Sequence, residues 1–333
     1  MRKPLIAGLA AAVIAVTGAA AQDEFRPAVV YDLGGKFDKS FNEGVYNGVK
    51  RFSDETGIEV MEFEVTNAAQ REQAITRMAQ RGASIVLGVG FAQADAIDKV
   101  AQEYPDTDFA IIDVFWLDQP NLRQYAFKEH EGSYLVGVAA AKASETGTVG
   151  FVGGMDVPLI RKFACGYIQG VKATNPDADV LQNMTGTTPS AWNDPTKGAE
   201  LTRSQIDRGA DVVYHAAGGT GLGVIRAAAD QGKLAIGVDS DQYDVAPGSV
   251  LTSMLKRVDN AAYNSFMDAK NGKFSAGVVT LGLSDSGVDY VSDANNADLL
   301  TAPIREAVED AKAKIISGEI EVHNYESDQS CPV

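Results

Sequence analysis

The stretch Gly34–Asn42, which reads GGKFDKSFN, brings aromatic, acidic and amide side chains close together in the chain. Phe37 and Phe41 could offer a flat face to a bound ring. Asp38 and Asn42 could contact the polar edge of the same ring. A structural alternative exists, in which the aspartate or the serine caps the following helix and the phenylalanines pack in the core. Spacing alone favours this structural interpretation.

A second candidate is the glycine-rich turn Ala217–Gly223, which reads AGGTGLG and contains Gly219. Its backbone N–H groups could bind an anion or hydroxyl oxygens. The turn does not match the dinucleotide fingerprint, because Val224 stands where the third glycine belongs, and the chain has no P-loop sequence. We therefore expect no nucleotide cofactor.

The acidic stretch Asp239–Asp244 superficially resembles a calcium loop. It lacks glycine at the sixth position, which is Asp244, and glutamate at the twelfth, which is Val250. No metal site is therefore expected. Carboxylates at the end of a strand more often bind sugar hydroxyls or cap the next turn.

Catalytic constellations are absent from the sequence. There is no G-x-S-x-G motif, and His130, His215 and His323 sit on unrelated segments without an obvious serine or cysteine partner. Paired carboxylates are frequent but none stands out, so we expect a protein that is not an enzyme, with an enzyme of unidentified chemistry as the alternative.

Strands and helices alternate along most of the chain. The expected strands are 28–33, 58–65, 84–89, 109–114, 148–152, 180–185, 211–216, 234–238 and 250–253, with one more short strand in the loop at 284–297. The expected helices are 41–52, 68–81, 92–103, 131–143, 159–173, 195–207, 222–229, 260–271 and 302–316. This rhythm predicts an α/β protein built from two doubly wound units in tandem.

Open parallel sheets bind ligands outside the carboxyl ends of their strands, and two facing units would place those ends on a shared cleft. The segments expected at the cleft are Gly34–Asn42, Gly90–Gln93, Asp113–Trp116, Gly153–Phe163, Ala217–Gly223 and Asp239–Asp244.

Composition limits the partners. The 333 residues are 45% hydrophobic and 22% charged, which is typical of a globular protein with a core. The net charge of −16 repels phosphate backbones, so a nucleic-acid polymer is not an expected partner, and anionic membrane surfaces are disfavoured.

The N-terminus has the pattern of an export signal. Arg2 and Lys3 precede an apolar run at Leu5–Val16, and small residues at 19–21 predict cleavage after Ala21. The alternative is an apolar helix that stays in the mature protein. Export leads to an oxidising compartment, where the only two cysteines, at positions 165 and 331, either form a disulfide or remain separate thiols.

A family resemblance rests on an ordered set of motifs. GGKFDKSFNEGVYNG at 34–48 resembles the opening motif of the basic membrane protein family, the exported solute-binding proteins of ABC importers. The resemblance continues through Asp113, FKEHEGSYLVG (127–137), GGMDVPLIRKFACGY (153–167), VVYHAAGGTGLG (212–223), GVDSDQ (237–242) and TSMLKRVD (252–259).

The resemblance implies a type I periplasmic-binding-protein fold with two lobes joined by a hinge. After a signal peptide at 1–21, it places 22–127 and about 250–282 in the N-terminal lobe. Residues 128–249 and about 283–325 form the C-terminal lobe, and 326–333 form a tail. The implied ligand is a nucleoside, with a purine as the leading base.

The resemblance also implies roles for individual residues. Phe41 and Tyr214 would stack on the base, with Phe37 as the substitute for Phe41. Trp116 and Trp192 would either supply a ring or be ordinary packing. The remaining contacts would come from Asp38 and Asn42 to the base edge, Asp113 to base or ribose, and Asp239, Lys256 and the Gly219 N–H to the ribose.

The implied partners are a nucleoside and an ABC transporter permease, with membrane contact only through that permease. The implied location is the periplasm, and we expect a monomer. A phosphate on the ligand would require arginines, and Arg161 is the only one expected in the cleft segments. The alternatives are another small solute, such as a sugar or autoinducer-like molecule, or an exported nucleoside-processing enzyme.

Overall fold

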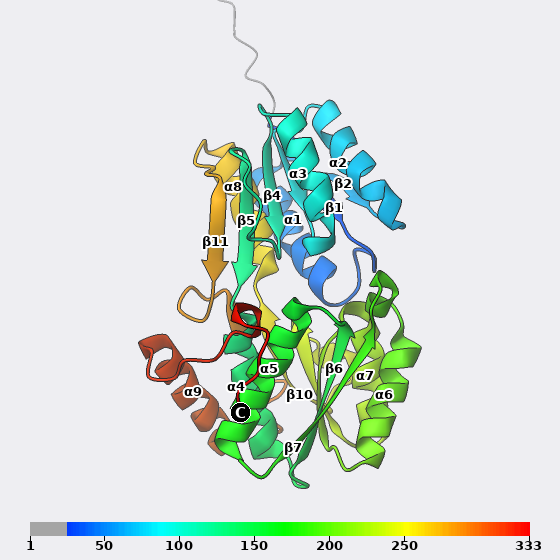
Figure 1. Ribbon diagram of the computed structural model, residues 1–333, viewed down its shortest axis with the longest axis vertical. Coiled ribbons are helices and arrows are strands. Elements are labelled where there is room, and N and C mark those ends of the chain that lie inside the picture. Colours follow the sequence, from blue (N-terminus) through cyan, green and yellow to red (C-terminus); the bar gives the residue numbers. More distant parts are fainter. Residues whose placement is uncertain (1–24) are drawn as a thin grey trace, which may run out of the picture.

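The computed structural model describes residues 25–333, so the expected signal peptide and its cleavage site lie outside the described residues. Figure 1 shows two α/β lobes along the long axis of the molecule. Each lobe contains one six-stranded sheet, in the orders β11-β5-β4-β3-β1-β2 and β12-β10-β9-β8-β6-β7. The alternation of strands and helices therefore predicts the fold class correctly.

The first lobe is built on parallel strands only. Its strands are β1 (Pro27–Tyr31), β2 (Met61–Glu64), β3 (Ile85–Gly88), β4 (Asp108–Ile112), β5 (Leu122–Phe127) and β11 (Gly277–Leu281). Its helices are α1 (Phe41–Thr56), α2 (Arg71–Gln80), α3 (Ala94–Glu103) and α8 (Val258–Lys270). Alternate residues of β1 face opposite layers: Val29 and Tyr31 join one hydrophobic cluster, and Ala28 and Val30 join the other.

The second lobe is parallel except for β12, which is antiparallel to β10. Its strands are β6 (Thr148–Met155), β7 (Asp179–Gly186), β8 (Val212–Ala216), β9 (Leu234–Asp239), β10 (Val250–Lys256) and β12 (Val288–Tyr290). Its helices are α4 (Glu129–Ala143), α5 (Pro158–Thr174), α6 (Pro195–Asp207), α7 (Gly221–Asp230) and α9 (Ala302–Ser317).

One expected boundary is wrong. The strand expected at 250–253 was placed in the N-terminal lobe, but β10 (Val250–Lys256) pairs with β9 and β12 of the second sheet. The chain enters the first lobe only after this strand, where α8 packs against α1. Periodicity predicts that a strand exists but not which sheet accepts it, because the pairing partners are distant in the sequence and leave no trace in the local pattern.

Three segments connect the lobes. The chain passes between them after β5, after β10 and after β11. The first two crossings lead directly into α4 and α8, so Glu129 and Lys256 stand at the hinge itself. Side chains at these positions can therefore couple the two lobes.

The helices α4 and α5 cross closely because glycines stand at the crossing. A Cβ at Gly166 would lie 2.3 Å from the carbonyl oxygen of His130, and one at Gly170 would lie 2.1 Å from that of Tyr134. Both values are shorter than real contacts of a Cβ atom. The first turn of α4 is thus held against α5, so their facing side chains meet.

The variant Gly166→Ala should push these helices apart. Overpacking of this kind costs about 1–3 kcal/mol, which should lower the melting temperature by several degrees. The control is Ala173→Ser on the exposed side of α5, which should leave the midpoint unchanged. Equal midpoints for the two variants in calorimetry would contradict the close crossing.

The tail is fixed to the second lobe by a disulfide. Cys165 of α5 and Cys331 are bonded, with their Cα atoms 5.6 Å apart. The disulfide is therefore the correct one of the two alternatives that the sequence left open. The two cysteines are 166 residues apart in the sequence, and their bond holds the tail against α5.

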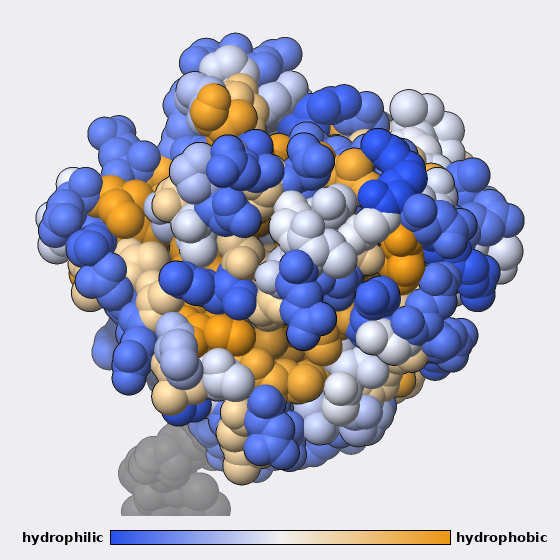
Figure 2. Space-filling view, turned by 90° about the horizontal axis from the view of Figure 1, so that it is seen from below, coloured by the Kyte–Doolittle hydropathy of each residue, from blue (hydrophilic) through white to orange (hydrophobic). Residues whose placement is uncertain are grey.

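The face of the second lobe seen in Figure 2 is mostly hydrophilic, with several hydrophobic areas between the polar side chains. Within residues 25–333, no helix combines the length and the apolar character that crossing a membrane requires.

Candidate functional site

A pocket lies between the lobes at the carboxyl ends of the strands, as expected for this fold class. Its empty volume is about 880 Å³, part of which is open to solvent. Seven of the sequence-predicted residues line it together: Asp38, Phe41, Asn42, Asp113, Trp192, Asp239 and Lys256.

Three residues that are not glycine hold left-handed backbone beside this pocket. Lys39, Asp113 and Asp239 have φ of 60°, 67° and 65°. This conformation costs a non-glycine residue on the order of 1 kcal/mol, and such strain gathers at functional sites. It turns the Asp113 and Asp239 side chains toward the cleft at the ends of β4 and β9.

Lys256 is the charged centre of the pocket. Its Nζ lies 2.6 Å from Asp113 Oδ1 and 2.9 Å from Glu129 Oε1, and its side chain is 2% exposed. Burial disfavours its charge, but the two carboxylates outweigh burial and raise its pKa above the usual value. Burial likewise opposes ionisation of Glu129, yet Lys162 and Lys256 lower its pKa to about 2. Lys256 and Glu129 therefore stay charged at neutral pH, whereas burial raises the pKa of Asp113 although Lys256 acts in the opposite direction.

The carboxyl group of Asp239 differs from that of Glu129 in the direction of its pKa shift. Burial raises its pKa to about 7, although Lys256 and a hydrogen bond from Ser40 act in the opposite direction. The Ser40 hydroxyl donates to Asp239 Oδ2 at 2.5 Å. Asp38 and Asp113 also face this carboxyl and raise its pKa further. Asp239 thus changes charge near neutral pH.

The segment at 38–42 combines both interpretations that the sequence left open. Asp38 accepts hydrogen bonds from the backbone N–H groups of Ser40, Asn42 and Glu43 at 2.8, 3.0 and 3.1 Å, so it caps α1. It also lines the pocket. Asn42 donates to Asp38, while its Oδ1 atom is buried without a hydrogen-bond partner. An unpaired buried acceptor in a pocket wall is suited to a ligand donor.

The aromatic lining comes from both lobes. Phe41 belongs to the first lobe, while Trp192 and Phe163 belong to the second. Lys256 Nζ lies 5.2 Å from the ring centroid of Phe41 and 5.6 Å from that of Phe163. The indole of Trp192 lies over Gly154, where a Cβ would come within 2.2 Å of it, so β6 needs glycine there.

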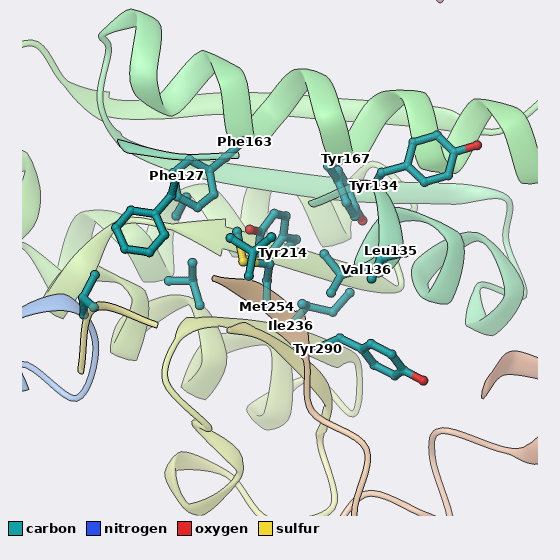
Figure 3. Close-up of a cluster of buried hydrophobic side chains, with 14 of the residues drawn as sticks. Phe127, Tyr134, Leu135, Val136, Phe163, Tyr167, Tyr214, Ile236, Met254 and Tyr290 are labelled. Atoms are coloured by element: carbon teal, nitrogen blue, oxygen red, sulfur yellow. The ribbon is translucent and has the colours of Figure 1, made fainter. Parts of the chain in front are cut away.

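The expected stacking residue Tyr214 is not in this pocket, which corrects the sequence prediction. It is completely buried, and its hydroxyl lies 3.2 Å from the Ser133 hydroxyl. Its ring packs on Phe151 and Tyr167, at centroid distances of 5.5 and 5.2 Å. Figure 3 shows Tyr214 inside the core of the second lobe. Because β8 continues beyond it to Ala216, its ring belongs to the layer below the cleft.

Three other expected residues lie outside the lining. Phe37 is 64% exposed and packs edge-on against Tyr46. Trp116 is 54% exposed and packs against Phe115. Gly219 is near the cleft, since a Cβ there would lie 4.0 Å from the Asp38 Cβ, but it does not line the pocket.

The structure adds residues that the sequence analysis did not select. Arg71 lines the pocket and pairs with Asp32 at 2.9 Å, whereas Arg161 pairs with Asp156 and is not in the lining. The expectation that Arg161 is the only arginine of the cleft is therefore wrong. Phe163 was within an expected cleft segment, but nothing in the sequence indicated that its ring faces the pocket.

The histidines do not form a catalytic group with these residues. Burial lowers the pKa of His215 to about 4, and its Nε2 pairs with the Gln242 side chain at 2.9 Å. Burial also lowers the pKa of His130 to about 4. Within residues 25–333, no three His, Cys, Asp or Glu side chains are arranged to hold a metal ion.

The lobes also touch beside the pocket. Besides the bond from Ser40 to Asp239, Gln242 Nε2 donates to the Lys39 carbonyl at 2.9 Å. Loop 38–40 of the first lobe therefore meets loop 239–242 of the second. A ligand between the lobes would be enclosed by this contact.

Known proteins resemble this chain over most of its length. The family described as ABC transporter substrate-binding protein PnrA-like matches residues 25–326. A protein named CD4+ T-cell-stimulating antigen from Listeria monocytogenes is 33% identical, covering 90% of this chain and 88% of its own. The ABC transporter nucleoside-binding protein BmpA from Lactococcus lactis is 32% identical, with 92% and 91% covered.

Solved structures agree with the fold. A solute-binding protein of an ABC transporter system from Aeropyrum pernix has a TM-score of 0.82 at 29% identity, covering 90% of this chain and 93% of its own. The fold is the type I periplasmic-binding-protein fold. With the family match and the interlobe pocket together, the chain belongs to the PnrA-like family of ABC transporter substrate-binding proteins, whose partners are a small-molecule ligand and a transporter permease.

Proposed function

We propose that this protein captures a nucleoside, with a purine as the preferred base, and delivers it to the permease of an ABC importer. The observation that carries the proposal is one pocket with aromatic rings from both lobes beside a strongly polar corner. Planar bases are held by stacking, and polyhydroxyl sugars are held by carboxylates and amines. The Lactococcus lactis relative, which is named as nucleoside-binding, supports this ligand class.

The residues divide by the part of the ligand that they suit. Phe41 and Trp192 lie on opposite lobes and are the proposed stacking pair, with Phe163 completing the apolar wall. The unpaired Oδ1 of Asn42 would accept from a base N–H. Asp239 and Lys256 would hold ribose hydroxyls, and Asp113 would orient Lys256.

The charge of the lining favours a neutral ligand. Asp32, Asp38, Asp113 and Asp239 contribute four carboxyl groups, against the two cations Arg71 and Lys256. Both cations are already paired with carboxylates. A nucleotide phosphate would meet an acidic site without a free arginine, so a nucleoside fits better than a nucleotide.

Nucleoside affinity should fall as the pH is lowered through neutrality. An ionised Asp239 accepts two hydroxyl hydrogen bonds, and its pKa is about 7. Between about pH 8 and about pH 6 the fraction ionised drops roughly tenfold, and so should the affinity measured by titration calorimetry. Asp239→Asn should bind weakly with no such slope. A wild-type affinity that is constant across this range would contradict the role.

Folding stability should depend on pH in the opposite direction from nucleoside affinity. The unfolded chain ionises this carboxyl near its ordinary value of 3.8, while the folded chain keeps the proton up to about 7. Between these values the folded state binds more protons, so this group makes stability fall as pH rises. Asp239→Asn should remove that contribution in denaturant titrations.

The ligand class is tested by thermal unfolding of protein stripped by partial unfolding and refolding. A ligand at about a thousand times its dissociation constant stabilises by roughly 4 kcal/mol and should raise the midpoint by several degrees. Guanosine, inosine and adenosine should do so, and ribose should not. A shift with sugars or amino acids, and none with nucleosides, would favour another solute. Release of free base during incubation would favour a nucleoside-processing enzyme.

The proposal includes the setting of the protein. Export through the N-terminal signal, cleavage after Ala21 and a periplasmic monomer fit a receptor that collects solute for a permease. The disulfide is consistent with an oxidising compartment.

A further inference from the structure

Five buried or partly buried charges form a chain that starts at the pocket and ends in the C-terminal tail. They alternate in sign, and each neighbouring pair forms an ion pair. Asp113 and Lys256 are 2.6 Å apart, and Lys256 and Glu129 are 2.9 Å apart. Lys162 then lies 2.7 Å from Glu129 and 2.6 Å from Glu326. The tail therefore contributes a charge to the same network as the pocket lysine.

In the structure the whole segment after α9, residues 318–333, forms the tail, and three anchors hold it on one face of α5. Lys162, Cys165 and Gln169 are three and four residues apart, so they project from the same side of the helix. Lys162 pairs with Glu326, and Cys165 is bonded to Cys331. Gln169 exchanges hydrogen bonds with the backbone of His323, at 2.8 and 3.0 Å.

The anchors bring the tail to the hinge. The short helix η6 (Tyr325–Ser327), which carries Glu326, packs against α5. In Figure 1 this red turn lies beside the end of α5 that is nearest the first lobe. Lys162 also donates to the carbonyl of Phe127, the last residue of β5 before the first crossing, at 3.1 Å. The tail thus acts on the first crossing as well as on the charge network.

We propose that the disulfide-anchored tail is a positioning element of the binding pocket, in which Glu326 acts through Lys162 and Glu129 to hold Lys256 in place. Lys162 has only 5% of its side chain exposed and needs two carboxylates to balance its buried position. Without Glu326, Glu129 becomes the only carboxylate left to Lys162. Glu129 then shifts toward Lys162, and Lys256 loses one of its two partners.

The inference rests on the proposed function, since Lys256 is placed at the ribose there. Loss of the tail contact should therefore weaken nucleoside binding more than binding of the free base, which does not reach Lys256. Glu326→Gln should weaken the nucleoside by roughly five- to tenfold, as found for residues along such networks. Glu326→Asp should recover part of the affinity. The matched control is Glu321→Gln, an exposed carboxylate of the same tail.

The disulfide provides a second route that does not depend on the Glu326 variant. Reduction of the wild type, or Cys331→Ser, should free the tail and give a similar loss. Reductant should not affect Cys331→Ser. If both changes act through one contact, Glu326→Gln and Cys331→Ser together should lose little more than either one alone.

The experiment combines calorimetric titration of guanosine and guanine with hydrogen exchange of the unliganded full chain. Expected are a lower ratio of nucleoside to base affinity and faster exchange at 128–132 and 256–259, in Glu326→Gln and in reduced wild type. The inference would be overturned by unchanged hydrogen exchange combined with either of two affinity results. These are an equal loss of affinity for guanosine and guanine, or no loss for either ligand. If the wild type binds no nucleoside, the proposed function fails, and the exchange measurement alone decides this inference.

Discussion

Replacing Lys256 by methionine should lower the free energy of unfolding by about 3–5 kcal/mol. The variant leaves Asp113 and Glu129 facing each other without their shared cation, in a site where the two side chains are 7% and 1% exposed. Removing one partner from a buried ion pair costs far more than the pair itself contributes, because the remaining charge stays desolvated. Differential scanning calorimetry at neutral pH should show a midpoint roughly 10 °C lower.

The control is Lys50→Met, which removes a lysine from an exposed pair with Asp54. The two side chains are 54% and 62% exposed, and such pairs contribute at most about 1 kcal/mol. Adding Asp113→Asn to Lys256→Met should restore part of the midpoint, because it removes an unpaired charge. Equal midpoints for Lys256→Met and Lys50→Met would show that the Lys256 network does not stabilise the fold.

Phe41→Ala and Trp192→Ala should each weaken nucleoside binding by roughly tenfold to a hundredfold. Each ring lines the pocket from a different lobe, so both are needed to enclose a base. Stacking on an aromatic side chain contributes about 1–3 kcal/mol per base. Calorimetric titration of stripped protein gives the dissociation constants.

The chain offers a matched control for each ring. Phe37→Ala changes a ring four residues before Phe41, and Trp116→Ala changes the second tryptophan. Both rings are mostly exposed and lie outside the lining. These controls should bind as the wild type does. Losses of equal size in Phe37→Ala and Phe41→Ala would contradict the proposed stacking pair.

The fold could be predicted where burial imposes a clear pattern. The strands β5 and β11 were not predicted, because their sequences carry no such pattern. In β5, Arg123 and Gln124 interrupt the apolar sequence, yet both are buried, with Arg123 paired to Asp268 and Gln124 bonded to Leu117. The edge strand β11 is largely exposed, so its residues carry little hydrophobic alternation. The local sequence shows neither the partners that allow Arg123 and Gln124 to be buried nor the position of β11 at the edge of its sheet.

The sequence predicted which segments reach the cleft better than it predicted which side chains line the pocket. Asp113, Asp239 and Lys256 come at strand ends, which the fold brings to one cleft. Tyr214 lies only two residues before the end of β8, and that small offset places it in the core. Trp192 and Arg71 reach the pocket from outside the selected segments, through loop and helix placement that sequence spacing does not determine.

The central claim is that the interlobe pocket binds a neutral nucleoside. The measurement that tests it most directly is calorimetric titration of the stripped, refolded protein with guanosine, beside guanosine monophosphate and ribose. We predict saturable binding of one guanosine per chain, much weaker binding of the monophosphate and none of ribose. Absence of guanosine binding by folded protein, or tighter binding of the monophosphate, would contradict the account.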